Sequence, residues 1–291
     1  MEIIAISDTE FKKFRALIYD LAGIALSPEK IQVVQSRLQR RLRHFGLVSF
    51  SDYYDLVTGK SCPTGEIEAL VNCVTTNTTS FFREQHHFDF VKHRAIPEIL
   101  DELQYGSTNP HLRIWHAGCS TGEEPYSLAI TLAACRRTLS IPFTYRQLAT
   151  DIDTNVLATA ESGIYDEDKV AGIPDSVRRS GFLRGSDDKS HLYKVRPEIR
   201  DQISFRQINL LDDNWPLRTT TRFDMIWCRN VVIYFDKPTQ RKLFARFAER
   251  LVPGGYLFIG HSESMLGVSD AYDSVGQTIY QVRAPVMEKA A

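Results

Sequence analysis

Small and acidic residues near position 120 could hold a polar or charged ligand. The stretch HAGCSTGEEPYSLAI, residues 116–130, follows an apolar strand-like run and leads into a helix-like run. Gly118 and Gly122 let the backbone turn tightly and approach a ligand, and the first N–H groups of the helix would face that ligand. The stretch lacks the Gly-x-Gly-x-x-Gly of dinucleotide sites and the Gly-Lys-Ser/Thr of phosphate loops. It predicts another kind of cofactor loop, or only a tight turn.

A carboxylate follows the next predicted strand. The segment LATDID, residues 148–153, puts Asp151 and Asp153 near a strand end. A carboxylate there accepts hydrogen bonds from both hydroxyls of a nucleotide ribose, although the spacing from the loop exceeds the usual ~20 residues. Capping of the following helix is the alternative for both residues. We interpret Asp153 as a helix cap and Asp151 as the ribose ligand.

Two later strands also end in polar residues. Asn209 in INLLDD could read an adenine edge, and Arg229 and Asn230 end the run FDMIWCRN. Polar side chains are unexpected at these strand ends unless they have a functional role. Tyr234 lies close by, and either a core position or a functional role fits it. These positions predict a site at the carboxyl ends of the strands.

A basic helix could bind an acidic partner. Arg37, Arg40, Arg41 and His44 recur at helical spacing, and Arg43 lies beside them. A solvated helix face is the ordinary reading of such a run, but the formal net charge is only −1, so the clustering is informative. Nucleic acid is a competing partner for the same face, and the near-neutral charge argues against a protein that coats it.

Periodicity divides the chain near residue 76. Residues 1–76 read as helices, with a capping box in SDTE and an apolar stripe that stops near Gly46. From residue 111 to 291, strand-like runs alternate with helices, which predicts a doubly wound, mostly parallel α/β sheet. The segment at about 170–202 is too long for a plain connection, and we expect it to form a small inserted antiparallel unit.

Composition narrows the class of protein. The chain has 291 residues, 43% of them hydrophobic and 24% charged, as in globular proteins. No run of ~18 apolar residues predicts a membrane span, and the N-terminus lacks the pattern of a signal peptide. The five cysteines form no metal-binding pattern, so we expect reduced thiols and no metal.

Several motifs, taken together and in order, resemble the CheR family of chemotaxis receptor methyltransferases. They are TTNTTSFFRE, HAGCSTGEEPYSLAI, ATDID, CRNVVIYF and GGYLFIGHSE. The resemblance covers nearly the whole chain and implies a Rossmann-like domain that binds S-adenosylmethionine (SAM), with S-adenosylhomocysteine (SAH) as product. The implied reaction is methyl transfer to receptor glutamates, which gives glutamate methyl esters and serves adaptation in chemotaxis signalling.

The resemblance also implies roles for individual residues. Glu123 or, better, Glu124 would reach the charged amino-acid end of SAM, Gly118 belongs to the same loop, and Asp151 would hold the ribose. Asn209 and Leu210 would flank the adenine, and Cys228, Arg229 and Asn230 would line the pocket. Residues 77–110 form a linker and helix that contribute to the site, and the residues expected there are Asn77, Thr79 and Arg83.

The implied chemistry needs little proton transfer. A glutamate carboxylate is already ionised at neutral pH, so positioning should dominate, and we expect Arg83 and Tyr234 to orient the reactants.

Arg37, Arg40, Arg41 and Arg43 would dock on the cytoplasmic methylation helices of transmembrane chemoreceptors. The inserted unit carries RGSDDKS where some relatives have a glycine-rich loop for a receptor-tail peptide, so such tethering is in doubt. A cytoplasmic monomer is expected. The alternatives are a methyltransferase for RNA or a small molecule, and a SAM-binding sensor.

Overall fold

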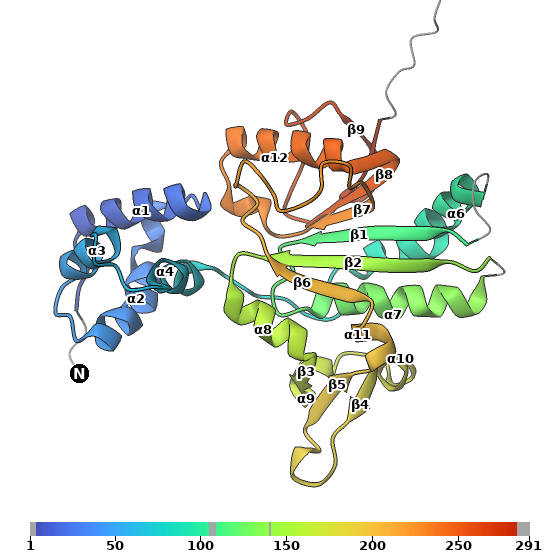
Figure 1. The fold of residues 1–291 in the computed structure, drawn as a ribbon, viewed down its shortest axis with the longest axis horizontal. Coiled ribbons are helices and arrows are strands. Elements are labelled where there is room, and N and C mark those ends of the chain that lie inside the picture. The colour runs from blue at the N-terminus through green and yellow to red at the C-terminus, as the bar shows by residue number, and fades with distance from the viewer. Residues whose placement is uncertain (1–3, 105–108, 140, 284–291) are drawn as a thin grey trace, which may run out of the picture.

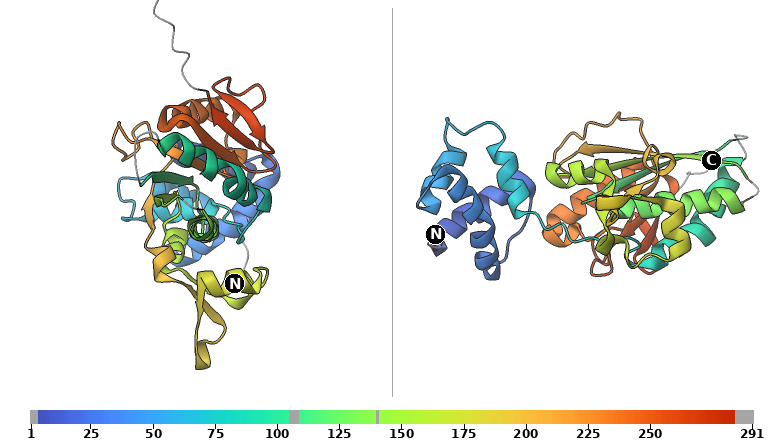
Figure 2. Two further views of the ribbon diagram at one scale, coloured as in Figure 1. Left: turned by 90° about the vertical axis from the view of Figure 1, so that its right-hand side faces the viewer. Right: turned by 90° about the horizontal axis from the view of Figure 1, so that it is seen from below.

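The computed structural model describes residues 4–104, 109–139 and 141–283, so positions 1–3, 105–108, 140 and 284–291 of the predicted segments lie outside the described residues. A helical domain is followed along the chain by a larger sheet domain, and a small sheet is inserted into the latter between β2 and β6 (Figure 1). The linker at residues 75–84 joins the first two. Figure 2 shows the helical domain at one end of the molecule and the small sheet projecting from the larger domain.

The helical domain consists of amphipathic helices that bury one face each. Ser7 caps the first helix and pairs reciprocally with Glu10, which confirms the predicted capping box, and Gly46 ends the second helix in the left-handed conformation. The buried residues of this domain form a core of their own around Phe14, Leu38 and Tyr53. Its elements are α1 (Asp8–Ala22), η1 (Pro28–Lys30), α2 (Ile31–Phe45), α3 (Phe50–Thr58) and α4 (Glu66–Val74).

The larger domain is built on a seven-stranded sheet in the order β6-β2-β1-β7-β8-β10-β9. Strands β6, β2, β1, β7 and β8 are parallel, and β10 and β9 add an antiparallel edge. The strands are β1 (His111–Ala117), β2 (Thr144–Asp151), β6 (Ile203–Gln207), β7 (Phe223–Cys228), β8 (Leu251–Ile259), β9 (Tyr272–Gly276) and β10 (Ile279–Val282). The predicted doubly wound, mostly parallel sheet is confirmed.

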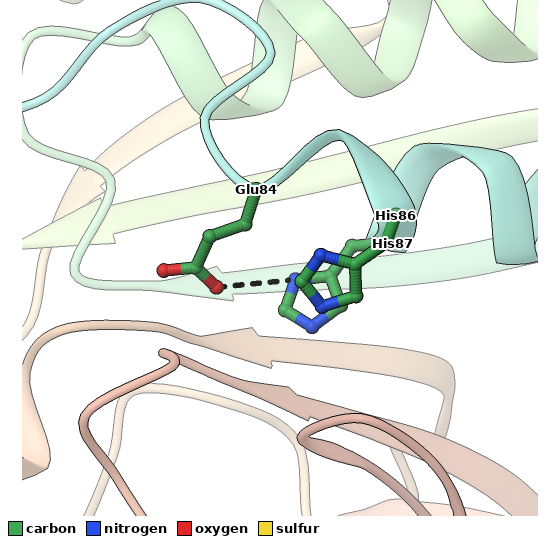
Figure 3. A group of neighbouring side chains, drawn as sticks. All are labelled: Glu84, His86 and His87. Carbon is green, nitrogen blue, oxygen red and sulfur yellow. Dashed lines mark ion pairs between the residues drawn. The ribbon is translucent and has the colours of Figure 1, made fainter.

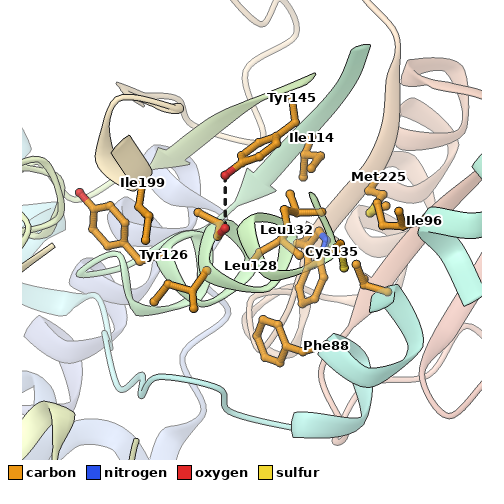
Figure 4. Packing of buried hydrophobic residues seen from close by; sticks show 14 of the residues in the cluster. Phe88, Ile96, Ile114, Tyr126, Leu128, Leu132, Cys135, Tyr145, Ile199 and Met225 are labelled. Atoms are coloured by element: carbon orange, nitrogen blue, oxygen red, sulfur yellow. Dashed lines mark hydrogen bonds between the residues drawn. The ribbon is translucent and has the colours of Figure 1, made fainter. Parts of the chain in front are cut away.

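Helices cover both faces of this sheet. Alternate residues of β7 point to opposite sides, so Met225 and Trp227 join the core beneath α7, whereas Ile226 and Cys228 join the core beneath α12. Figure 4 shows the first of these cores, where Leu128 and Leu132 of α7 pack beside Ile114 and Tyr145. The helices are α5 (Gln85–Phe90), η2 (Val91–Ala95), α6 (Ile96–Gln104), α7 (Glu123–Thr138), α8 (Thr154–Ser162), η4 (Val232–Tyr234) and α12 (Lys237–Arg250).

The inserted unit is a three-stranded antiparallel sheet in the order β3-β5-β4. It begins at Ile164, a few residues earlier than the sequence predicts, because the strand that follows Gly163 pairs with β5 instead of extending α8. Its elements are β3 (Ile164–Asp166), α9 (Glu167–Val170), α10 (Asp175–Gly181), β4 (Phe182–Arg184), η3 (Asp187–Lys189), β5 (Leu192–Val195) and α11 (Pro197–Arg200).

Within the described ranges, no helix combines the length and the apolar content needed to cross a membrane.

Candidate functional site

A cavity of about 590 Å³ lies between the helical domain and the carboxyl ends of the parallel strands. This is the edge at which doubly wound sheets place their ligands, beside the strand where the order reverses. Most of the residues that the sequence singles out line this cavity. They are Arg37, Asn77, Thr79, Arg83, Gly118, Glu124, Asp151, Asn209, Leu210, Arg229, Asn230 and Tyr234.

The loop between β1 and α7 follows a path that needs its glycines. Gly118 has φ +99°, and a Cβ added there would lie 2.4 Å from Cγ2 of Val231. The backbone N–H groups of Gly118 and Cys119 both donate to the carbonyl of Thr150, which ties the loop to the end of β2. A larger residue at position 118 would therefore push this loop away from β7 and change the floor of the cavity.

Asp151 is held at the end of β2 with its carboxylate toward the cavity. It is 8% exposed and accepts hydrogen bonds from the N–H of Ser120 (2.8 Å) and the N–H of Asp153 (3.0 Å), one at each oxygen. Burial raises the pKa of Asp151 in spite of these bonds. Each oxygen keeps a lone pair, so the fixed carboxylate could accept two neighbouring hydroxyls. Asp153 instead caps α8, as predicted.

A buried chain of charges lies beside Asp151. Glu124 Oε2 accepts from Arg229 Nη1 (3.0 Å), and Arg229 Nη2 pairs with Glu84 Oε2 (3.3 Å). The Arg229 side chain is 2% exposed and lies over the Trp227 ring. Burial alone would raise the pKa of Glu84, but Arg229 and the hydrogen bonds from His261 outweigh it and hold the pKa at about 2. Glu84 is therefore ionised, and both carboxylates are fixed by Arg229.

The linker closes the cavity from the helical side. Asn77 donates to Asp153 Oδ2 (2.7 Å) and its carbonyl accepts from the Ser120 hydroxyl, so the linker is bound to the loop and to α8. Arg83 Nη1 donates to the carbonyl of Thr78 (3.0 Å), which folds this side chain back over the linker.

Asn209 has both ends of its amide engaged within the chain. Its nitrogen donates to the carbonyl of Leu21 in α1 (3.0 Å), and its oxygen accepts from the N–H of Leu211 (3.1 Å). The amide therefore joins the two domains, with one N–H and one lone pair left over. Leu210 supplies an apolar wall beside it.

Two of the predicted cofactor residues lie away from the cavity. Glu123 is fully buried and accepts from the Thr121 hydroxyl (2.6 Å) and Lys169 Nζ (3.1 Å), so it braces the loop against α9. Cys228 points into the core beneath α12, and burial raises the pKa of its thiol. Glu123 and Glu124 are adjacent at the start of α7, so only the fold shows that Glu124 faces the cavity and Glu123 does not.

The four predicted substrate arginines do not form one free basic face. Arg37 donates to the carbonyls of Val74 (2.6 Å) and Thr75 (2.9 Å) and lines the cavity. Arg41 pairs with Glu66, which is nearly buried. Arg40 and Arg43 remain exposed.

Sequence reasoning missed three residues that shape the site. Glu263 accepts from the N–H groups of Asn230 (3.0 Å), Gly260 (2.5 Å) and Ile233 (3.3 Å), and so fixes the turn after β7. Burial raises the pKa of Glu263. Glu84 pairs with Arg229, and His116 pairs with Glu124. All three stand in the quoted motifs, at the end of TTNTTSFFRE, at the start of HAGCSTGEEPYSLAI and at the end of GGYLFIGHSE, but nothing in those motifs shows which partners they hold.

One group of possible metal ligands touches this network. Ligand atoms of Glu84, His86 and His87 lie within 4.8 Å of one another (Figure 3). The guanidinium of Arg229 already faces the same Glu84 oxygen that pairs with His87, so it supplies the positive charge that a cation would bring. Burial and Arg229 lower the pKa of His87 to about 3, which leaves this ring neutral.

Two family models match this chain. Residues 9–75 match "CheR methyltransferase, all-alpha domain", and residues 77–281 match "CheR methyltransferase, SAM binding domain". The chain belongs to the CheR methyltransferase family. The SAM-binding domain of this CheR methyltransferase contains β1 to β10, with the loop and the strand ends that line the cavity.

Relatives match over nearly their whole length. Chemotaxis protein methyltransferase 2 of Pseudomonas aeruginosa is 42% identical over 93% of this chain and 92% of its own. The Escherichia coli chemotaxis protein methyltransferase is 40% identical over 96% and 92%. Among solved structures, magnesium protoporphyrin IX methyltransferase from Synechocystis with bound SAM is 15% identical, with a TM-score of 0.38 over 80% of this chain and 91% of that one.

Proposed function

We propose that the protein transfers a methyl group from SAM to glutamate side chains of chemoreceptors, giving glutamate methyl esters and SAH. The observation that carries this proposal is the set of fixed carboxylates in the cavity, Asp151 and Glu124, in a chain whose family methylates with SAM. The names of the relatives, chemotaxis protein methyltransferases, support the receptor as substrate.

The cavity fits SAM by its chemistry. Asp151 keeps a free lone pair on each oxygen for the ribose hydroxyls, and Glu124 offers a carboxylate to the ammonium of the amino-acid end. Ile208 and Leu210 give an apolar surface for the adenine. When bound, SAM supplies an electrophilic methyl group on a sulfonium. In this assignment, Asn209 supports the wall of the cavity and Glu123 supports the loop, and neither contacts SAM.

The residues of this chain act by orientation. The substrate carboxylate needs no base, so the protein has to bring the two reactants into line and exclude water. Arg83 and Tyr234 line the cavity on the side of the linker and the turn after β7, and we assign them this role. Because opposite charges are lost along the reaction, a strong new cation on the carboxylate would stabilise the ground state more than the transition state.

The receptor is expected to meet the helical domain. Arg40 and Arg43 are exposed on α2 and could face acidic positions of a methylation helix, whereas Arg37 and Arg41 would only support them. The proposal includes a cytoplasmic monomer that uses no metal and binds no nucleic acid. It assigns no tethering to the inserted unit, because its loop carries Asp187 and Asp188.

Methyl transfer to receptor membranes tests this function. Label from the methyl group of SAM should appear on the receptor, should be released by alkali, and should fall at least tenfold with Asp151→Ala. Asp270→Ala, an exposed aspartate outside the cavity, is the matched control and should leave transfer unchanged. SAM binding without transfer to receptors, with label on RNA or on no substrate, would contradict the proposal.

Tyr234 offers a second test. Tyr234→Phe removes the hydroxyl and keeps the ring, so turnover should fall about tenfold while the pH profile keeps its shape. The measurement is the methylation rate at saturating SAM from pH 6 to 9. A new pH dependence in the variant would show that the hydroxyl exchanges a proton.

A further inference from the structure

His116 is a fully buried polar side chain in the middle of the sheet. It lies on β1 between α7 and β2, and its ring is 5.8 Å from the ring of Trp227. Its Nδ1 is 2.8 Å from Oε1 of Glu124, and its Nε2 is 2.7 Å from Oε1 of Gln147. Both ring nitrogens are therefore engaged at short distances, and the ring does not itself line the cavity.

The groups on both sides of the ring are hydrogen-bond acceptors. The Glu124 carboxylate can only accept. Gln147 is oriented by its own nitrogen, which donates to the carbonyl of Pro125 (3.3 Å), so its oxygen must face His116. A neutral imidazole offers one donor and one acceptor, whereas the protonated ring offers two donors. Only an imidazolium satisfies both contacts without protonating Glu124.

The surrounding charges balance such a cation. Glu124 also accepts from Arg229, and Arg229 pairs with Glu84, so these two carboxylates face Arg229 and a protonated His116, while the exposed His261 contacts Glu84 from the far side. The remaining neighbours add no charge: Trp227 and Gln147 are neutral, and burial raises the pKa of Cys228. His87 beyond Arg229 is also neutral. Buried charges persist when each is paired and hydrogen-bonded, and this set meets that condition.

We propose that His116 is a buried imidazolium that positions the Glu124 carboxylate toward the amino group of SAM. The ring holds Oε1 while Arg229 holds Oε2, so the carboxylate is fixed at both oxygens. His116 is thus a positioning residue, because it acts through Glu124 and touches neither substrate nor cofactor. The inference deepens the proposed function and rests on its assignment of Glu124 to the cofactor.

The protonation state can be measured on the protein without ligand. In the full chain with ¹⁵N-labelled histidine, long-range ¹H–¹⁵N spectra at pH 7.5 should show both nitrogens of His116 protonated. The signal is assigned by its loss in the His116→Asn variant. In Glu124→Gln the negative partner is gone, and His116 should become neutral. A ring with one bare nitrogen in the unmodified protein would overturn the proposal.

A matched pair of variants tests positioning. His116→Asn keeps an N–H near the place of Nδ1, and His116→Leu has a similar size but no donor. SAH affinity, measured by calorimetry, should stay within about threefold for Asn and weaken about tenfold for Leu, the effect of one charge-assisted hydrogen bond. Equal losses in both variants would indicate packing alone and would overturn the positioning role. If the Leu variant fails to fold, the spectra of the unmodified protein and of the Asn variant still test the protonation state of His116.

The outcomes separate the two proposals. A protonated His116 and a Leu-specific loss of SAH affinity, without methylation of receptors, would leave the inference standing and reject the proposed function. Receptor methylation with a neutral His116 would reject the inference alone.

Discussion

The two walls of the cavity are built in different ways. On the sheet side, Glu124 and Arg229 are almost completely removed from water, and each has charged partners. On the helical side, the cavity is lined by exposed residues such as Lys30 and Val33, and Arg37 is the charged side chain there that donates to backbone carbonyls, those of Val74 and Thr75. The sheet wall is prepared before a ligand arrives, as suits a cofactor of constant shape. The helical wall is open, as suits a large substrate that varies.

The largest effect on stability is expected from substitution of Arg229, at the centre of the sheet wall. Arg229→Met leaves Glu84 and Glu124 as buried carboxylates without the guanidinium that they share, which should cost about 3–5 kcal/mol in the free energy of unfolding. Urea denaturation at pH 7.5 measures it. Arg283→Met breaks the exposed pair with Asp273 and is the control, which should leave stability unchanged. Similar small losses in both variants would mean that the buried pairs add little.

A pH effect on stability should come from His87. The pKa of this ring is lowered to about 3 in the folded protein from an ordinary 6.5, so the unfolded chain binds a proton first as pH falls. The free energy of unfolding should therefore decline below pH 6.5, by at most about 1.4 kcal/mol per pH unit.

The His87→Asn variant isolates this effect. Glu84 acts in the same direction, but only below its ordinary value of 4.5, whereas the raised pKa values of Asp151 and Glu263 act in the opposite direction. The difference between the unmodified protein and the variant, measured in urea from pH 5 to 7.5, should shrink as pH falls. A constant difference would show that His87 takes up a proton in the folded state.

The smallest effects should separate two neighbouring arginines of α2. Arg41→Gln loses the pair with Glu66 and should lower stability by about 1.5 kcal/mol, with little change in methylation kinetics at low temperature. Arg40→Gln should leave stability unchanged and raise the KM for receptor about threefold, because it removes one surface charge. Exchange of these two results would place the receptor contact on Arg41 instead.

The sequence predicted residues whose role depends on their neighbours in the chain. It missed residues whose role depends on partners far away in the chain. Asp153 could be recognised as a cap because it directly precedes the first residue of α8, and its side chain accepts from the N–H groups two and three residues later. Arg41 looked free because Glu66 is far along the chain, and the helical spacing says nothing of a partner on α4. His116 could not be singled out, because its meaning comes from Glu124 on the next helix and Gln147 on the neighbouring strand.

The core of the helical domain is separate from the two cores that pack on the sheet. The domains are joined by hydrogen bonds such as that from Asn209 to Leu21, and by the linker. Without a ligand, each domain can therefore lose its structure with a melting transition of its own. A molecule that fills the cavity contacts both domains, so its binding energy merges the two transitions into one cooperative unit.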